Sequence, residues 1–488
     1  MSKVLEELVT TIGLEIHVEL KTNSKMFCGC PVEFGGEPNT RVCPVCLGHP
    51  GTLPVINEQA VEFTTKIAMA LGCKIAPRSV FARKNYFYPD MPKNYQISQY
   101  DMPLGLGGTL EVELGEKSFP VGITRVHLEE DTGKSIHVGG GGRIHEAEYS
   151  LEDFNRAGTP LVEIVTEPDI TSPEMARAFA GQLRSILESL EVSDVRMEEG
   201  SMRIDANVSV APRGRRSPKT EVKNLNSMRS LLRALEYEQE RQRQVLARGD
   251  VPEQSTRHWD EKAGQTKPLR SKEEAFDYRY FPEPDLVPLQ PSVEWLRQLD
   301  EELPELPADR KRRFVDEFGL STYDAGVLVS TKWVGDLYEA AADAAQVAQP
   351  KQVANWVVND LLGLLPGGPD GARHAVEPAR VAELVDLVAS GTISKSQGQR
   401  VLQMMLDDGR APRAIVEAEG MQQVSDRAEL ERAVEQVIAS NADVAARISA
   451  GDNKPFGFLM GQVMKATRGQ ANPAVVREVI RQRLGARG

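Results

Sequence analysis

The sequence predicts an α+β protein in three parts: a mixed α/β domain over residues 1–292, a helical domain over 293–410 and a small helical tail domain over 411–488. Three observations lead to this expectation. The chain has 488 residues, which is too long for one hydrophobic core. Segments before residue 292 repeatedly alternate polar and apolar residues with the period of a strand. From Val293 onward the apolar spacing becomes that of helices.

The first predicted strand, residues 13–20, separates its apolar and ionisable residues onto opposite faces, because a strand has a period of two. Glu15, His17 and Glu19 share the ionisable face. Two carboxylates flanking an imidazole can hold Mg²⁺. A charged face that simply meets water explains the same pattern, and the strand by itself leaves both readings open.

Paired cysteines follow this strand at once. Cys28 and Cys30 are separated by twelve residues from Cys43 and Cys46, which approximates the two knuckles of a zinc ribbon. The first knuckle has one spacer residue where two are usual. We expect a closed, structural Zn²⁺ site rather than four free thiols. Cys73 stands apart and is expected to be buried.

Two further segments of the α/β domain combine charge with other chemistry. Residues 83–99 mix cations, including Lys84 and Lys93, with aromatic and amide side chains, which fits either nucleotide or RNA binding or a structural aromatic loop. The acidic run Glu129–Asp131 ends a predicted strand at 122–128. Although Gly133-Lys134-Ser135 resembles the end of a phosphate loop, Leu128 replaces its first glycine. The acids are better suited to holding Mg²⁺.

The rest of the α/β domain shows one more strand with a polar face and two capped helices. Residues 202–210 alternate, which places Asp205 and Asn207 on one face. Ser172-Pro173 predicts the start of a helix that runs to about residue 190. A second helix is predicted from about Ser227 to Arg248, ending at Gly249.

Helices dominate the remaining chain. They are predicted over 294–302, 310–318, 333–345 and 351–365, before a breaker-rich linker at 366–371, and again over 426–440. The segment 454–488 has seven basic residues against one acid. A basic tail on a chain of net charge −13 indicates a polyanionic partner at that end, with a solvated helix face as the alternative.

Composition and absent motifs exclude several function classes. The first residues contain no apolar targeting segment, and the sequence has no apolar run long enough to cross a bilayer. We therefore expect no membrane association. Five cysteines in so long a chain fit a reducing cytoplasm. The sequence has neither a Gly-x-Ser-x-Gly motif nor a Ser-Lys amidase pattern, so we expect no amidase centre in this chain.

The stretch at residues 151–170, LEDFNRAGTPLVEIVTEPDI, closely resembles the signature of the B subunit of aspartyl/glutamyl-tRNA(Asn/Gln) amidotransferases. Further segments resemble the family in the same order, at 13–21, 83–99, 128–137, 199–207, 221–227, 277–286 and 461–472. The resemblance implies that the first domain is a cradle built on an antiparallel sheet with flanking helices.

The resemblance also implies an activity. Such a protein is an ATP-dependent kinase that phosphorylates the side-chain carboxylate of Glu-tRNA(Gln) or Asp-tRNA(Asn). Ammonia from an amidase A subunit then displaces the phosphate, and the pair is stabilised by a small C subunit. The complex is a carbon–nitrogen ligase with glutamine as the amido donor. This activity needs acids and lysines but no nucleophile.

The resemblance assigns roles by position. Glu15, His17 and Glu130 resemble the Mg²⁺ ligands, with Glu129 as a neighbour or alternate. Lys84 and Lys93 resemble cations near the reaction centre and the ammonia path, and Lys84 with Asp205 and Asn207 would complete the ATP pocket. The four cysteines match the zinc-bearing branch of the family. Lys465, Arg468 and Arg477 would contact tRNA.

Two other functions compete with the kinase. A non-catalytic tRNA-docking scaffold would use the tail alone and leave the acidic strand faces solvated. A zinc-dependent hydrolase would use Glu15, His17 and a water, but the closed set of four cysteines argues against it.

Overall fold

The computed structural model describes residues 8–115, 117–139, 147–269, 278–365, 376–421, 427–450, 452, 454–467, 471 and 473–485. The chain forms two compact units, Met1–Pro307 and Ala308–Gly488. The first unit is α+β and the second is helical, so the predicted fold class is confirmed.

The first unit carries the strands together with four of the described helices. In chain order they are β1 (Leu8–Glu19), α2 (Glu58–Ala70), β2 (Lys74–Ile75), β3 (Ala82–Asn85), β4 (Tyr95–Ser98), β5 (Gly105–Leu114), β6 (Lys117–Glu130), β7 (Lys134–Val138), β8 (Tyr149–Asp153), β9 (Pro160–Thr166), α3 (Pro173–Ser189), β10 (Met202–Pro212), β11 (Thr220–Leu225), α4 (Met228–Ala247), β12 (Ser255–Asp260), β13 (Gln265–Pro268), β14 (Phe281–Pro282) and α5 (Val293–Glu301).

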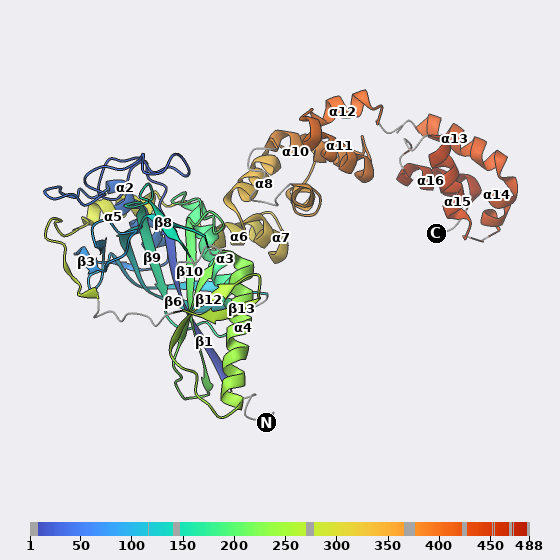
Figure 1. The fold of residues 1–488 in the computed structure, drawn as a ribbon. Helices are drawn as coiled ribbons and strands as arrows, with labels where there is room; N and C mark the ends of the chain where they lie inside the picture. Colours follow the sequence, from blue (N-terminus) through green and yellow to red (C-terminus); the bar gives the residue numbers. More distant parts are fainter. Residues whose placement is uncertain are drawn as a thin grey trace. The chain divides into compact units, whose positions relative to one another are not determined.

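A nine-stranded sheet forms the centre of this unit, in the order β13-β12-β11-β10-β1-β9-β6-β5-β2 (Figure 1). Its neighbouring strands are antiparallel except for the parallel pair β11 and β12. A three-stranded sheet, β14-β3-β4, and the β7–β8 hairpin complete the strands. β1 lies in the middle of the large sheet. Its apolar and polar faces therefore show which side of the sheet packs against helices and which side carries ionisable residues.

Helices α2, α3 and α4 cover the apolar face of the sheet. Leu14, Ile16 and Val18 of β1 are fully buried in one core with residues of these helices. The predicted starts of the two long helices are confirmed: Ser172 caps α3 and Ser227 caps α4, each accepting a hydrogen bond from a backbone N–H in the first turn. The opposite, polar face of the sheet is therefore left for the candidate site.

The second unit contains helical elements throughout its described residues. They are α6 (Pro307–Asp316), α7 (Thr322–Leu328), α8 (Lys332–Ala344), α9 (Pro350–Asn355), a π-helical segment η3 (Trp356–Leu361), a 3₁₀ turn η4 (Leu362–Leu364), α10 (Pro378–Ala389), α11 (Lys395–Asp408), α12 (Pro412–Ala418), α13 (Arg427–Ser440), α14 (Ala442–Ser449), α15 (Phe456–Ala466) and α16 (Pro473–Leu484).

The compact units and cores do not coincide with the predicted boundaries at 292 and 410. Helix α5 belongs to the first unit, because Trp295 and the residues that follow the helix, Leu303 and Leu306, pack against the sheet core. Within the second unit, one core includes Ile415 of α12, and a separate core holds α13 to α16. The predicted linker at 366–371 lies outside the described residues.

The lengths and compositions of the helices bear on whether the chain could span a membrane. None of the helices in the described part of the chain is long and apolar enough to cross one.

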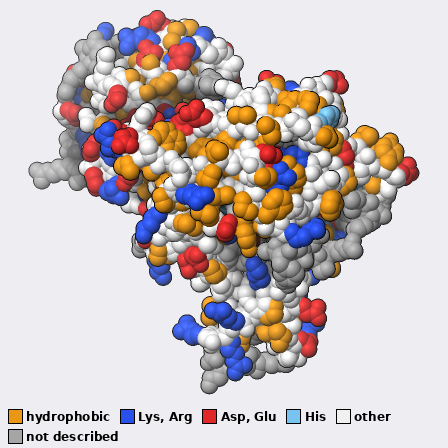
Figure 2. Space-filling view, turned by 90° about the vertical axis from the view of Figure 1, so that its left-hand side faces the viewer, with side chains coloured by type: hydrophobic (Ala, Val, Ile, Leu, Met, Phe, Trp, Pro, Cys, Tyr) orange, Lys and Arg blue, Asp and Glu red, His pale blue; other side chains and the backbone are white. Residues whose placement is uncertain are grey.

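On the face drawn in Figure 2, acidic and basic side chains are interspersed with hydrophobic ones, so the net negative charge is not gathered there as one patch.

Candidate active site

The polar face of the large sheet carries ionisable side chains from four adjacent strands. In the strand register, His17 of β1 lies opposite Glu163 of β9, and Glu163 lies opposite His127 of β6. On the other side of β1, His17 lies opposite Arg203 of β10. One row across the sheet thus contains two histidines, a carboxylate and an arginine, and the antiparallel register builds it.

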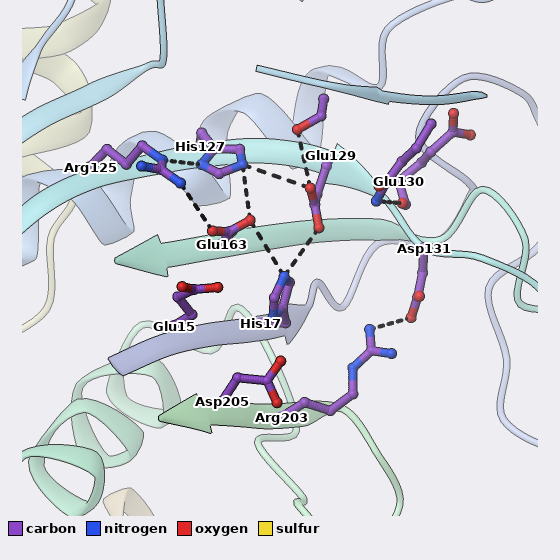
Figure 3. A network of polar contacts seen from close by, with 12 residues as sticks. Glu15, His17, Arg125, His127, Glu129, Glu130, Asp131, Glu163, Arg203 and Asp205 are labelled. Atoms are coloured by element: carbon purple, nitrogen blue, oxygen red, sulfur yellow. Dashed lines mark hydrogen bonds and ion pairs between the residues drawn. The ribbon is translucent and has the colours of Figure 1, made fainter. Parts of the chain in front are cut away.

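Two carboxylates and two imidazoles converge on this row (Figure 3). His17 Nε2 lies 3.5 Å from Glu129 Oε1 and 3.4 Å from Glu163 Oε2. His127 Nε2 lies 3.7 Å from Glu129 Oε2 and 3.3 Å from the same Glu163 oxygen. Ser98 Oγ donates a hydrogen bond to Glu129 Oε2 at 3.1 Å. We name His17, His127, Glu129 and Glu163 the carboxylate–histidine cluster.

Burial and charge act against each other in this cluster. Burial opposes the charged imidazolium of His127, yet Glu163 and Glu129 raise the pKa of His127 to about 9. Burial alone would raise the pKa of Glu163, but His127 and His17 hold that pKa well below its usual range. The pKa of Glu129 is lowered for the same reason. Both carboxylates are therefore ionised at neutral pH.

The cluster suits a hard divalent cation. His17, Glu129 and Glu163 each offer one ligand atom, and these atoms lie within 4.8 Å of one another. Carboxylate oxygens are the preferred protein ligands of Mg²⁺, and a neutral imidazole is an acceptable one. The donor set fits Mg²⁺, and the positive charge would balance two buried carboxylates.

A cavity of about 710 Å³ opens onto the cluster, which is a size typical of ligand sites. Glu15, Asp205 and Asn207 line it. Asn207 Nδ2 donates to Glu15 Oε1 at 2.9 Å, and Asp205 is paired with Lys223 at 2.7 Å. Further side chains that reach this cavity are Lys84, Ser98, Gln99, Tyr100, Arg125, Lys219, Glu221, Tyr278 and Tyr280.

Glu130 lies elsewhere. Its carboxylate forms an ion pair with Lys93 and accepts a hydrogen bond from Ile97 N at 2.9 Å. It lines a second cavity, of about 210 Å³, which Cys28 and Cys46 also line. Glu15, His17 and Glu130, the ligand set expected from the sequence, are therefore not gathered at one point. Glu163 takes the place beside His17 and Glu129.

Asp131 occupies a third environment. Its carboxylate lies 2.6 Å from Arg203 and 3.6 Å from Arg156, and it is buried. Glu19 shares a hydrogen bond with it, and burial together with this like charge raises the pKa of Glu19 to about 8. The three consecutive acids of the predicted triplet thus serve three different contacts.

Comparison with known proteins identifies the family. Residues 10–297 match the family described as GatB/GatE catalytic domain, and residues 336–484 match the one described as GatB domain. A protein of Moorella thermoacetica, named as the B subunit of aspartyl/glutamyl-tRNA(Asn/Gln) amidotransferase, is 52% identical over 481 residues, covering 98% of this chain and 100% of the relative. Relatives of the same name from Carboxydothermus hydrogenoformans and Brevibacillus brevis are each 49% identical, covering 98% of this chain and 99% of theirs. The chain belongs to the family of aspartyl/glutamyl-tRNA(Asn/Gln) amidotransferase B subunits.

In this family member the four cysteines of the predicted knuckles come together. Their sulfur atoms lie within 4.8 Å of one another, and the Sγ atoms of Cys43 and Cys46 are 3.9 Å apart. Zn–S bonds of about 2.3 Å in a tetrahedron require sulfurs about 3.8 Å apart. The residues present fit a tetrahedral zinc ion. Cys73 is buried apart from them.

The described part of the helical tail places two of the three predicted tRNA contacts. Lys465 lies on α15 and Arg477 on α16, and both side chains are exposed. Arg468 lies outside the described residues. The roles of Lys465 and Arg477 stay predictions.

Sequence reasoning gave no role to Glu163, His127 or Arg125. Arg125 and His127 lie in the predicted strand at 122–128, and Glu163 lies in the stretch at 151–170 that resembles the family signature. Arg125 Nη2 contacts Glu163 Oε1 at 3.3 Å and so belongs to the same network. Strand alternation put each on a definite face, but only the pairing of β1, β9 and β6 shows that these faces coincide.

Proposed function

We propose that this chain is the cytoplasmic kinase component of a tRNA-dependent amidotransferase. It activates the side-chain carboxylate of Glu-tRNA(Gln), Asp-tRNA(Asn) or both with ATP. The observation that carries the proposal is the carboxylate–histidine cluster, which opens onto a cavity of ligand size. The names of the relatives support the substrate class.

The chemistry explains why a kinase is required. A carboxylate is a poor electrophile, because its departing oxygen would leave as an oxide. In the proposed reaction a carboxylate oxygen attacks the γ-phosphorus of ATP, and the bond to ADP breaks. Ammonia then attacks the acyl carbon, loses a proton, and phosphate departs. The product is Gln-tRNA(Gln) or Asn-tRNA(Asn).

Catalysis of this phosphoryl transfer is mainly positioning and charge neutralisation. His17, Glu129 and Glu163 would hold Mg²⁺, with Glu15 close by on the same strand as His17. Bound there, Mg²⁺ would neutralise charge that develops on the transferred phosphoryl group. Lys84 reaches the same cavity and adds a cation, while Asp205 and Asn207 line it from the neighbouring strand β10.

The second cavity suggests where ammonia arrives. Lys93 and Glu130 line it, and Glu130 follows Glu129 directly in β6. The two cavities therefore lie on either side of the end of one strand. We assign the second cavity to the entry of ammonia, which an amidase A subunit would deliver. A small C subunit would complete a heterotrimer. Structural zinc at the four cysteines would hold the adjoining loop.

The test uses this chain co-expressed with its amidase and small partners. The complex receives Glu-tRNA(Gln) or Asp-tRNA(Asn), Mg²⁺ and [γ-³²P]ATP without an ammonia donor, and ammonium is added later. The proposal predicts tRNA-dependent ATP cleavage and amidation in wild type, both lowered about a hundredfold in Glu163→Gln. Full amidation in Glu163→Gln would instead favour a tRNA-docking scaffold with the chemistry on another chain.

A further inference from the structure

Three tyrosines from two distant segments form one wall of the larger cavity. Tyr100 follows β4, whereas Tyr278 and Tyr280 immediately precede β14. The rings of Tyr100 and Tyr280 are stacked, with centroids 4.2 Å apart and planes within 8° of parallel. Tyr278 meets Tyr280 edge to face at 6.1 Å. All three line the cavity that contains the carboxylate–histidine cluster.

The wall is held by backbone pairing and by its own ring contacts. Phe281 of β14 pairs with Arg83 of β3, which fixes the segment that carries Tyr280 beside the β3–β4 hairpin. The two stacked tyrosines are thus brought together although 180 positions separate them in the sequence. A pre-formed aromatic wall loses little conformational freedom when a flat ligand stacks on it.

The exposure of Tyr100 differs from that of a structural aromatic pair in the same chain. Tyr100 is 50% exposed. In the helical unit, Phe314 and Tyr338 also pack as a ring pair, at 5.0 Å, but both are fully buried. Core packing therefore accounts for the second pair and leaves the accessible ring surface of Tyr100 unexplained.

A charged side chain connects the aromatic wall with the carboxylate–histidine cluster. Lys84 Nζ lies 5.0 Å from the centre of the Tyr278 ring, and its charge also acts on Glu129 of the cluster. The cavity thus has an aromatic wall, a bridging lysine and a carboxylate floor. This order of surfaces fits a ligand with a base at one end and a phosphate or acyl group at the other. The base would lie on the aromatic wall, and the phosphate or acyl group would react beside the carboxylates.

We propose that Tyr100 and Tyr280 form a stacking site for an adenine base. The inference rests on the proposed function, because both of its substrates carry adenosine: ATP itself and the 3′-terminal nucleotide of the tRNA. Stacking on an aromatic side chain is available to every base through its π face. The wall binds the base, and the cluster acts on the group at its other end.

The experiment separates the two sources of adenine. The full complex is mixed with 2-aminopurine riboside triphosphate in one arm and with Glu-tRNA that carries 2-aminopurine at its 3′ end in the other. Stacking quenches 2-aminopurine fluorescence. Wild type should quench one probe, and Tyr280→Leu and Tyr100→Ala should abolish that quenching, whereas Tyr280→Phe should keep it because it retains the ring. Tyr323→Ala, at an exposed tyrosine of α7, is the matched control.

Steady-state kinetics provide the second readout. For the substrate whose probe is quenched, KM should rise at least tenfold in Tyr280→Leu and Tyr100→Ala, with kcat within twofold of wild type. Unchanged quenching and unchanged KM for both substrates in these variants would overturn the stacking site. If wild type cleaves ATP and the variants match it in quenching and in KM, the stacking site is refuted and the proposed function stands. Wild type that cleaves no ATP with either misacylated tRNA refutes the proposed function.

Discussion

Glu129 and Glu130 are consecutive residues of β6, yet their carboxylates line different cavities. Glu129 lies 3.5 Å from His17 in the cluster, whereas Glu130 is paired with Lys93 beside the cysteines. Strand geometry causes this division, because neighbouring side chains point to opposite faces of a sheet. The two acids should therefore respond differently to the same substitution.

Glu163→Gln and Glu129→Gln should each lower the amidation rate about a hundredfold, the size expected for one lost electrostatic contact at a reacting site. Each change removes a negative charge from the proposed Mg²⁺ site while keeping the shape of the side chain. The measurement is the rate as a function of Mg²⁺ concentration, which should need more Mg²⁺ in both variants. Glu111→Gln, at an exposed acid of β5, is the control. A wild-type Mg²⁺ dependence in both variants would remove the cluster from metal binding.

Lys93→Met should destabilise the fold by about 3–5 kcal/mol, because it leaves the charge of the buried Glu130 carboxylate without its cationic partner. The side chains of Lys93 and Glu130 are only 8% and 3% exposed. The double variant with Glu130→Gln should recover much of this loss, since the uncompensated charge is gone. Urea unfolding of wild type, Lys93→Met, Glu130→Gln and the double variant gives the coupling energy between the two side chains. Strictly additive losses would contradict the pairing.

The purified protein should contain one zinc ion per chain. Cys46→Ser should abolish zinc retention and lower the melting temperature, because the four sulfurs would no longer close a tetrahedron. Metal analysis and thermal unfolding measure both effects. Cys73→Ala is the matched control, since Cys73 is buried apart from the four sulfurs. Wild-type zinc content in Cys46→Ser would exclude the predicted site.

Glu238 should govern part of the acid stability of the first unit. It is fully buried on α4 and accepts hydrogen bonds from Arg241, Gln242 and Thr266. Burial alone would raise the pKa of Glu238, but these partners lower that pKa below its ordinary value of 4.5. The stabilisation is therefore fully present above about pH 4.5 and is lost as pH falls through the lower, folded-state pKa.

Glu238→Gln should accordingly cost about 2–4 kcal/mol at pH 7, and the difference from wild type should shrink in acid. Urea unfolding at a series of pH values measures it. Glu236→Gln, at an exposed acid on the same helix, should unfold like wild type at every pH. A pH-independent cost would mean that packing, rather than the carboxylate charge, accounts for the loss.

Lys465→Ala combined with Arg477→Ala should raise KM for the misacylated tRNA and leave KM for ATP unchanged. If each cation contacts one phosphate, the slope of log binding constant against log salt should become shallower by about 0.7–0.9 per contact, the range found for single-stranded and duplex DNA. Lys395→Ala combined with Arg297→Ala, at two exposed cations outside the tail, serves as the control. An unchanged salt slope in the double variant would show that Lys465 and Arg477 do not contact tRNA phosphates.

Local signals in the sequence were sufficient for much of the fold. Ser172-Pro173 and Ser227 mark the starts of α3 and α4, and Gly249, at φ +88°, follows the end of α4. Alternation over residues 13–20 correctly separates the buried face of β1 from its polar face. These features depend on residues close together in the chain, which is why the sequence predicts them.

The assembly of the site depends on strand pairing, which local signals do not contain. His17 and Glu163 are neighbours only because β1 pairs with β9 in one register, and a shift of one residue would reverse every face. Without that register, alternation separates Glu129 from Glu130 but does not show which of the two faces His17. The attachment of α5 to the sheet unit likewise depends on the long-range packing of Trp295.

The most direct test of the proposed mechanism follows the oxygen atoms. Glu-tRNA(Gln) or Asp-tRNA(Asn) labelled with ¹⁸O in the side-chain carboxylate is amidated by the complex with unlabelled ATP and ammonium, and the released phosphate is analysed by mass spectrometry. Activation as an acyl phosphate predicts one ¹⁸O atom in each phosphate formed, with phosphate release about a hundredfold slower in Glu163→Gln. Unlabelled phosphate formed together with Gln-tRNA or Asn-tRNA would contradict phosphorylation of the carboxylate.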